Sequence, residues 1–215
     1  MSSLGVFAAR EGHFDVLKWL HSKKFPLVID TFHYAALNGD IKILKFLKTN
    51  KCPYSPLVFS QAAKNGHYSA VVWFCENKFQ FDRYSIQSSA VGGHLDILKY
   101  LLTKCSSTTD DSFLPYVAKA GHLHILKFFF DERNWKPTEK SLNYAAAGGH
   151  LHIIEWLLDK KIALTENTCR YAAKNGQLHT LKWLRNNGCP WNSNAAITCA
   201  EEEGFEEIVQ WLKNL

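Results

Sequence analysis

Histidine is the residue type whose number and spacing first suggest chemistry in this chain. Ten of the 215 residues are histidine, and His-x-His occurs twice, at His122 with His124 and at His150 with His152. Imidazole nitrogens are common ligands of zinc and copper, so this spacing raises the question of a metal site. No cysteine or carboxylate completes a ligand set beside either pair. We therefore expect no metal-binding residues.

Five histidines share a second property, because each directly follows a glycine that recurs along the chain. They are His13, His67, His94, His122 and His150. This position assigns them to a turn between two helices. Corresponding residues of neighbouring units would lie about 8 to 10 Å apart, the usual spacing of packed helices, whereas zinc is bound at roughly 2 Å. Histidines from neighbouring units therefore cannot share one ion.

The cysteines form no recognisable reactive or cross-linking pattern. They are Cys52, Cys75, Cys105, Cys169, Cys189 and Cys199, with no CxxC pair among them. We interpret them as reduced, half-buried apolar residues of an intracellular chain. Cys52 and Cys189 stand beside proline in connecting segments. There we expect them to plug the end of a helix pair rather than to react.

No set of residues in the sequence is arranged for catalysis. No nucleophile, base and orienting acid converge in one motif, and no glycine-rich phosphate loop follows a strand pattern. The repeated Gly-His is the joint of two helices rather than a phosphate-binding turn. We expect no catalytic residues, no cofactor and no enzymatic activity.

A glycine that recurs along the chain predicts the helices that position these residues. It stands at Gly12, Gly39, Gly66, Gly93, Gly121, Gly149, Gly176 and Gly204, at intervals of 27 or 28 residues. An alanine pair precedes most of these glycines, as at Ala35-Ala36 and Ala172-Ala173, and an apolar helical run follows. A unit this short cannot bury its own apolar face and must stack on its neighbours. We therefore predict a single repeat domain over residues 1–215, with eight repeats centred on these glycines.

Each repeat is expected to form two antiparallel helices joined by a tight turn. In the second repeat, apolar residues recur at helical spacing, as at Ile43, Leu44 and Leu47, while Lys42 and Lys45 lie on the other face. The alanine pair lets another helix approach closely, and the glycine accepts a positive φ without strain. Every second helix also carries an aromatic residue at one fixed place, and we interpret this row as core. The row is Trp19, Phe46, Trp73, Tyr100, Phe128, Trp156, Trp183 and Trp211.

The recurring sequence motifs resemble the ankyrin repeat. They include Ala-Ala-Lys-Asn-Gly-His at 62–67, Gly-His-Leu-Asp-Ile-Leu-Lys-Tyr-Leu-Leu at 93–102 and Tyr-Ala-Ala-Lys-Asn-Gly-Gln-Leu at 171–178. The resemblance recurs eight times and implies an all-α solenoid of eight helix-turn-helix ankyrin-like repeats. The Lys-Trp-Leu endings at 18–20 and 182–184 look most like the ankyrin arrays of amoebae, oomycetes and the giant viruses that infect amoebae.

Two departures from the family pattern change what the resemblance implies. The family's Thr-Pro-Leu-His opening is nearly absent, and only His33 stands at the histidine place. The usual ankyrin period is about 33 residues and includes a β-turn element, so about five or six residues are missing here. The missing residues fall in the connection between the second helix of one repeat and the first helix of the next. The β-hairpin fingers of the family are therefore expected to be shortened or absent.

The resemblance also implies where a partner protein binds. In ankyrin arrays the first helices line a concave face, and the residues between the alanine pair and the glycine point into it. Carried over here, with tyrosines at the edge, this predicts a scaffold or adaptor whose groove takes a protein segment bearing acidic and apolar residues. The predicted binding residues are Arg10, Tyr34, Leu37, Lys64, Val91, Tyr116, Lys119, Tyr144, Tyr171 and Lys174. The competing interpretation is that the lysines only keep the chain soluble.

The charge of the chain leaves a second class of partner open. The formal net charge is +5, and lysines of the second helices would align on the outer face. They are Lys18, Lys45, Lys99, Lys127 and Lys182. Acidic residues alternate with them, and exposed aromatic platforms are not evident. We therefore rank binding of nucleic acid or another polyanion below protein binding.

The two ends of the sequence bear on the location and the solubility of the protein. The start shows no secretory signal, and no apolar run approaches the roughly 20 residues of a membrane span. We expect an intracellular protein, cytoplasmic or nuclear, that has no membrane partner and is a monomer. Five glutamates of the last repeat, at positions 201, 202, 203, 206 and 207, are interpreted as a solubilising cap.

Overall fold

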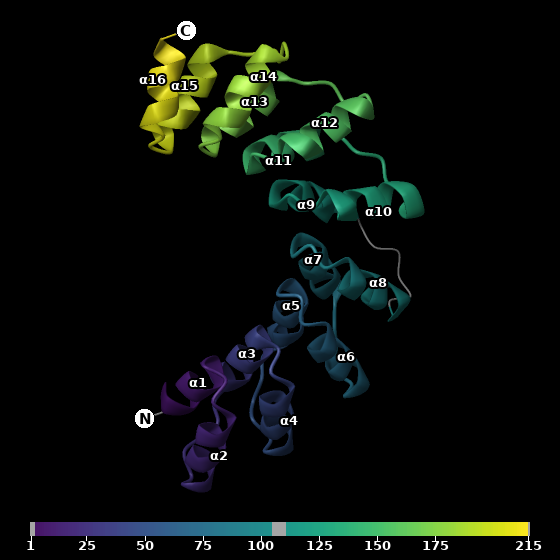
Figure 1. The fold of residues 1–215 in the computed structure, drawn as a ribbon, viewed down its shortest axis with the longest axis vertical. Helices are drawn as coiled ribbons and strands as arrows, with labels where there is room; N and C mark the ends of the chain where they lie inside the picture. The colour runs from purple at the N-terminus through teal and green to yellow at the C-terminus, as the bar shows by residue number, and fades with distance from the viewer. Residues whose placement is uncertain (1–2, 105–110, 215) are drawn as a thin grey trace. The chain divides into compact units, whose positions relative to one another are not determined.

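The computed structural model describes residues 3–104 and 111–214, and in these two stretches every regular element is helical (Figure 1). Sixteen α-helices and one short 3-10 helix alternate with turns, and no strand occurs in the described part of the chain. The structure thus confirms the all-α class and the helix-turn-helix repeats predicted from the sequence. Within the described stretches no β-hairpin finger is present, as the short repeat predicts, and short turns connect the helices.

The helices of the described residues form eight pairs, four in each of two compact units, Met1–Thr109 and Asp110–Leu215. The first unit holds α1 (Ser3–Arg10), α2 (Phe14–Ser22), α3 (Ile29–Asn38), α4 (Ile41–Thr49), α5 (Leu57–Lys64), α6 (Tyr68–Glu76), α7 (Arg83–Val91) and α8 (Leu95–Lys104). The second holds η1 (Asp111–Phe113), α9 (Leu114–Ala120), α10 (Leu123–Arg133), α11 (Glu139–Gly148), α12 (Leu151–Asp159), α13 (Glu166–Lys174), α14 (Leu178–Asn186), α15 (Ser193–Glu202) and α16 (Glu206–Lys213). A single repeat domain across both units stays a prediction.

A glycine in the left-handed region closes each first helix. At the end of α3, Gly39 has a φ of 66°, and the amides of Gly39 and Asp40 donate to the carbonyl oxygens of Ala36 (3.2 Å) and Ala35 (3.0 Å). These bonds satisfy carbonyls that the helix itself leaves without partners. The corresponding glycines of the other repeats have φ between 73° and 89°. The recurring glycine therefore marks the turn, as the sequence predicts, because only glycine adopts this φ without strain.

The first helices of each unit form its closely packed layer. Their alanine pairs are fully buried, as at Ala35 with Ala36 and at Ala172 with Ala173, because so small a side chain lets the next first helix approach. The second helices stand further from one another, and α2, α4 and α6 fan outwards in Figure 1. Within each unit, the first helices therefore line the inner side of a curved stack.

The aromatic row of the second helices is not core, so the interpretation from the sequence was wrong. Trp19 is 58% exposed, and of the eight residues only Trp73 and Phe128 are buried. The residue that follows each aromatic is the buried one, as Leu20 and Phe74 illustrate. One step along a helix rotates the side chain by about 100°, so the aromatic row lies on the flank of each second helix.

On that flank, the aromatic residues connect neighbouring helix pairs. Phe46 lies edge-on to Phe14 of the preceding pair, with ring centroids 5.7 Å apart. Tyr100 lies edge-on to Tyr68 of its preceding pair at the same distance. The row therefore contributes half-buried contacts between repeats rather than the centre of each repeat.

The connections after the second helices place a buried residue over the end of the pair. Cys52, Trp135 and Cys189 are each less than a tenth exposed. The burial of Cys52 and Cys189 fits the predicted plugs, whereas Tyr54, an aromatic residue beside the same proline as Cys52, is 48% exposed and does not. In the described residues, no helix is long and apolar enough to cross a membrane.

Candidate functional site

The turn histidines hold neighbouring helix pairs together. Nε2 of three of them lies within hydrogen-bond distance of a carbonyl oxygen near the end of the preceding first helix. The pairs are His67 with Leu37 (2.7 Å), His94 with Lys64 (3.0 Å) and His150 with Lys119 (2.9 Å). A carbonyl oxygen only accepts, so the geometry assigns the ring proton of each histidine to Nε2. Each ring therefore satisfies a carbonyl that the preceding helix leaves open.

The same side chains fill the space beside the turn glycines. A Cβ added to the glycine would collide with the residue that follows the next turn glycine. The pairs are Gly39 with His67, Gly66 with His94, Gly121 with His150, Gly149 with Gln177 and Gly176 with Phe205. The glycine is therefore required twice, for its positive φ and for the close approach of the next pair. The constant spacing of 28 or 29 residues between these partners is the sequence signal that could have revealed the second role.

The binding residues predicted in the first unit lie on the first helices α1, α3, α5 and α7. Arg10 and Lys64 are exposed, whereas Tyr34, Leu37 and Val91 are half-buried. The guanidinium of Arg10 lies 5.9 Å from the centroid of the Tyr34 ring, a cation–π distance, and 3.7 Å from a carboxylate oxygen of the next residue. The structure therefore brings Arg10 and Tyr34 together across neighbouring first helices.

Three of the predicted residues form a tyrosine ladder across the first helices of the second unit. Tyr116 of α9 lies edge-on to Tyr144 of α11 with ring centroids 5.2 Å apart, and Tyr144 lies 5.8 Å from Tyr171 of α13. Tyr116 is 45% exposed, and the other two are half-buried. Partial burial raises the pKa of Tyr144, and its hydrogen bond with Tyr116 raises it further. The hydroxyl of Tyr144 therefore stays protonated at neutral pH.

Two exposed lysines, both predicted binding residues, lie at the ends of the first helices that carry the tyrosine ladder. Nζ of Lys119 donates to Oδ1 of Asn175 at 3.0 Å and so links the ends of α9 and α13. Nζ of Lys174 lies 3.7 Å from a carboxylate oxygen of Glu203, an exposed ion pair that contributes little by itself. Because both lysines are more than a third exposed, a carboxylate of another protein can compete for either of them.

A polar network holds α13 against α11, the two helices that carry Tyr144 and Tyr171. The exposed carboxylate of Glu139 accepts three hydrogen bonds, one from its own helix and two from the start of α13. The donors are Oγ1 of Thr165 (2.8 Å), Nδ2 of Asn143 (3.3 Å) and Nδ2 of Asn167 (3.3 Å). These bonds, that from Thr165 most of all, lower the pKa of Glu139. The spacing along the chain did not reveal this network.

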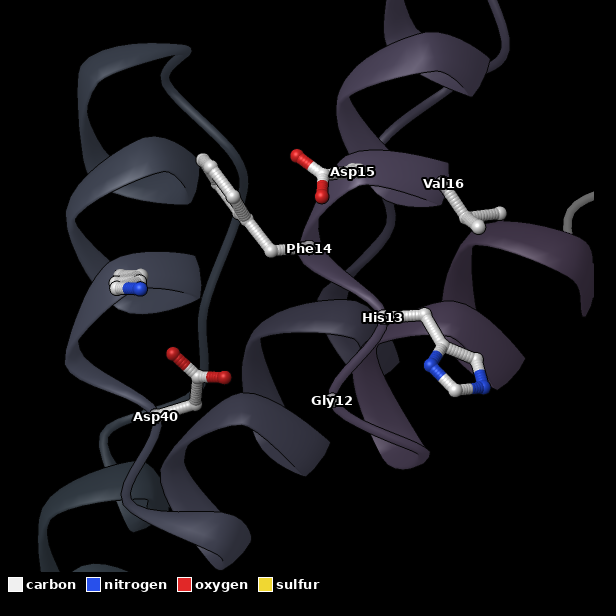
Figure 2. A pocket seen from close by; sticks show the side chains of 7 residues that line it. Gly12, His13, Phe14, Asp15, Val16 and Asp40 are labelled. Carbon is white, nitrogen blue, oxygen red and sulfur yellow. The ribbon is translucent and has the colours of Figure 1, made fainter.

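An open hollow lies at the first two helix pairs rather than among the predicted binding residues. It has a volume of ≈ 680 Å³ and is lined by residues 12–16 together with Asp40 and Lys42. Asp40 stands where the third to sixth repeats have a turn histidine and caps its own helix instead, accepting from the amide of Ile43 at 3.0 Å. Figure 2 shows the ring of His13 pointing away from Asp40. Nowhere in the described stretches do three or more His, Cys, Asp or Glu side chains form a group that could hold a metal ion.

Comparison with known proteins identifies the class to which this fold belongs. One family model, described as ankyrin repeats (3 copies), matches residues 88–168, and another, described as ankyrin repeats (many copies), matches residues 6–47. Together the two matches span more than half of the chain, which belongs to the ankyrin-repeat family. Ankyrin repeats generally mediate protein–protein interactions, and the proteins that carry them are typically non-catalytic.

A solved structure is also similar to this chain. It is the human ASB11 ankyrin repeat domain, which is 17% identical, with 97% of this chain and 96% of that chain covered and a TM-score of 0.43. A search of curated proteins found no match.

Proposed function

We propose that this chain is a non-catalytic scaffold or adaptor that binds a partner protein through the first helices of its units. The tyrosine ladder carries the proposal, because Tyr116, Tyr144 and Tyr171 form a continuous row that is partly open to solvent. Tyrosine combines a large, rigid contact area with a hydroxyl that can donate, and it is enriched at protein interfaces.

We further propose that the partner is a protein segment bearing acidic and apolar residues. Its apolar side chains would cover the tyrosine rings. Its carboxylates would take the places of the half-buried Asn175 and the exposed Glu203 beside Lys119 and Lys174. Charge complementarity of this kind acts mainly on the rate and specificity of association.

The first unit also combines exposed cations with an aromatic ring and apolar side chains. Arg10 and Lys64 supply exposed cations, and Tyr34 packs against Arg10. Leu37 and Val91 add half-buried apolar surface at the ends of their helices. We propose that this unit also contributes to binding, and that the second unit contributes more because its aromatic row is continuous.

The test compares two variants that change charge equally. The first carries Lys64→Glu, Lys119→Glu and Lys174→Glu on the first helices. The control carries Lys18→Glu, Lys45→Glu and Lys127→Glu on the second helices, where all three lysines are exposed. A partner is recovered from native cells by affinity capture and then measured with purified proteins. We expect about a tenfold or greater loss of affinity for the first variant and less than about twofold for the control. Equal affinities for both variants would reject the first-helix surface.

Binding of nucleic acid or another polyanion is the alternative outcome. It would appear as binding of any duplex with an affinity that falls linearly with the logarithm of salt concentration. The control variant, which alters the lysine row of the second helices, would then lose more affinity than the first variant.

Three further statements about this protein are also proposals. They are an intracellular location in the cytoplasm or nucleus, a monomeric state, and a particular similarity to the ankyrin arrays of amoebae, oomycetes and giant viruses. Imaging of the tagged protein in its native cell tests the first, and sedimentation of the purified chain tests the second.

A further inference from the structure

Two cysteines meet in the seventh repeat, between α13 and the connection that follows α14. Cys169 of α13 is 1% exposed, and Cys189 is 8% exposed. The thiol of Cys189 donates to the carbonyl oxygen of Thr165 at 3.3 Å, which places it beside the first turn of α13. Thr165 precedes Cys169 by one helical turn, so this bond also places the Cys189 thiol beside Cys169, and each of the two thiols shifts the pKa of the other. The two sulfur atoms are therefore neighbours, although the whole of α14 lies between them in the sequence.

The second repeat supplies an internal comparison, because Cys52 occupies the place that Cys189 has in the seventh. Each stands thirteen residues after the turn glycine of its repeat. Each thiol also donates to the carbonyl of the residue before the first helix, which for Cys52 is Val28 at 3.4 Å. The difference lies in the first helix, where Phe32 stands at the position of Cys169. Cys52 is thus a plug without a second sulfur beside it.

The two thiols of the seventh repeat differ in acidity. The contact with the Cys169 side chain lowers the pKa of Cys189; burial opposes this shift, and the backbone of Cys169 adds to it. The same contact, together with burial, raises the pKa of Cys169. In the second repeat, burial raises the pKa of Cys52 to about 11. Cys189 is therefore the thiol of the three that ionises first, and the thiolate is the reactive form of cysteine.

We propose that Cys169 and Cys189 form a reversible disulfide when the protein meets a peroxide. The Cys189 thiolate attacks one oxygen of hydrogen peroxide, the O–O bond breaks, and Cys189 becomes a sulfenic acid. The hydroxide released takes up the proton that the thiol lost and leaves as water. The sulfur of Cys169 then attacks that of Cys189, the S–O bond breaks, and the hydroxyl leaves as water with the Cys169 proton. Two thiols and one peroxide thus give one disulfide and two waters, and a dithiol reductant reverses the reaction.

The disulfide would join α13 to the segment that leads into α15. This second covalent link would restrain the connection to the last helix pair against the repeat that carries Tyr171 and Lys174. The sequence alone suggested unreactive plugs for cysteines beside proline. The contact between the two sulfur atoms changes that interpretation for Cys189 and leaves it in place for Cys52.

The test uses the purified full chain and needs no variant. The reduced protein is treated with hydrogen peroxide, the remaining thiols are alkylated, and the protein is digested without reductant for mass spectrometry. We expect a cross-linked peptide pair containing Cys169 and Cys189, and a loss of two of the six alkylatable thiols. Dithiothreitol should restore both thiols, and Cys52 should remain alkylatable throughout.

Two variants separate the cysteine pair from general oxidation. Cys52→Ser should lose two thiols as the wild type does, whereas Cys189→Ser, checked for folding by circular dichroism, should form no cross-link within the chain. Sulfinic acid at Cys189 without a cross-link would show that Cys169 does not resolve it. That result, or oxidation of Cys52 at the same rate as Cys189, would overturn the proposal.

Discussion

Nε2 of His67 lies 2.7 Å from the carbonyl oxygen of Leu37, across the joint between the second and third helix pairs. The bond satisfies a carbonyl near the end of α3, and the ring also fills the space beside Gly39. One side chain of the turn thus connects two repeats through both a hydrogen bond and packing. The arrangement recurs within both units, at His94 in the first and at His150 in the second.

Replacing His67 with alanine should weaken that joint. The change removes the hydrogen bond and the packed ring, so we expect the free energy of unfolding of the first unit to fall by about 1–2 kcal/mol. Hydrogen exchange of the α3 and α5 amides, measured in denaturant, would report it. His13→Ala is the matched control, because His13 is an exposed turn histidine. If the two variants exchange at the same rate, the bond to Leu37 contributes nothing measurable.

Replacing turn glycines with alanine should separate the backbone role from the packing role. Gly39 and Gly204 both have positive φ, 66° and 77°, but no atom lies within 4 Å of a Cβ placed on Gly204. Gly204→Ala should therefore cost only the left-handed backbone penalty, about 1–2 kcal/mol. Gly39→Ala should cost at least about 1 kcal/mol more, because its Cβ collides with the ring of His67.

The double variant Gly39→Ala with His67→Ala checks this explanation of the difference. Removing the ring removes the collision, so the double variant should lose less stability than the sum of the single changes. The measurement is denaturant unfolding of the wild type, the two single variants and the double variant. Additive losses would mean that the ring and the glycine act independently.

Mild acid should destabilise the second unit through His150. Burial lowers the pKa of His150 below its ordinary value of 6.5; its bond to the Lys119 carbonyl opposes this shift, and the nearby His152 adds to it. As the pH falls through about 6.5, the unfolded chain takes up a proton that the folded chain does not, so stability falls. Chemical unfolding between about pH 7.5 and 5.5 would show it. His150→Gln should remove this part of the pH dependence, while His179→Gln, at an exposed position, should keep it.

Glu139 should affect the stability of the second unit at a lower pH than His150 does. Its hydrogen bonds to Thr165, Asn143 and Asn167 lower its pKa below the ordinary 4.5. The stability that the carboxylate contributes is therefore present above that value and is lost as the pH falls through the folded-state pKa. Glu139→Gln should unfold more readily than the wild type at neutral pH and equally readily in strong acid. Glu166→Gln is the control, and an NMR titration showing an ordinary pKa for Glu139 would contradict the explanation.

The error over the aromatic row shows where sequence periodicity stops being informative. Helical spacing correctly identified the second helices, but Trp19 and Leu20 differ by only one position and both fit an apolar stripe. A step of about 100° separates the flank of a helix from its buried side. Which of the two positions is buried depends on how far the neighbouring second helices stand apart, and the sequence of one repeat does not contain that distance.

By itself, the sequence determined the repeat, the two helices within it and the turn that joins them. These follow from local chemistry, because glycine accepts the positive φ of the turn and alanine pairs allow first helices to approach. Only the tertiary structure decided which side chains of different helices meet, such as Tyr116 with Tyr144 and Cys169 with Cys189. Those contacts depend on the spacing and rotation between packed helices, which arise from their packing and not from the pattern within any one of them.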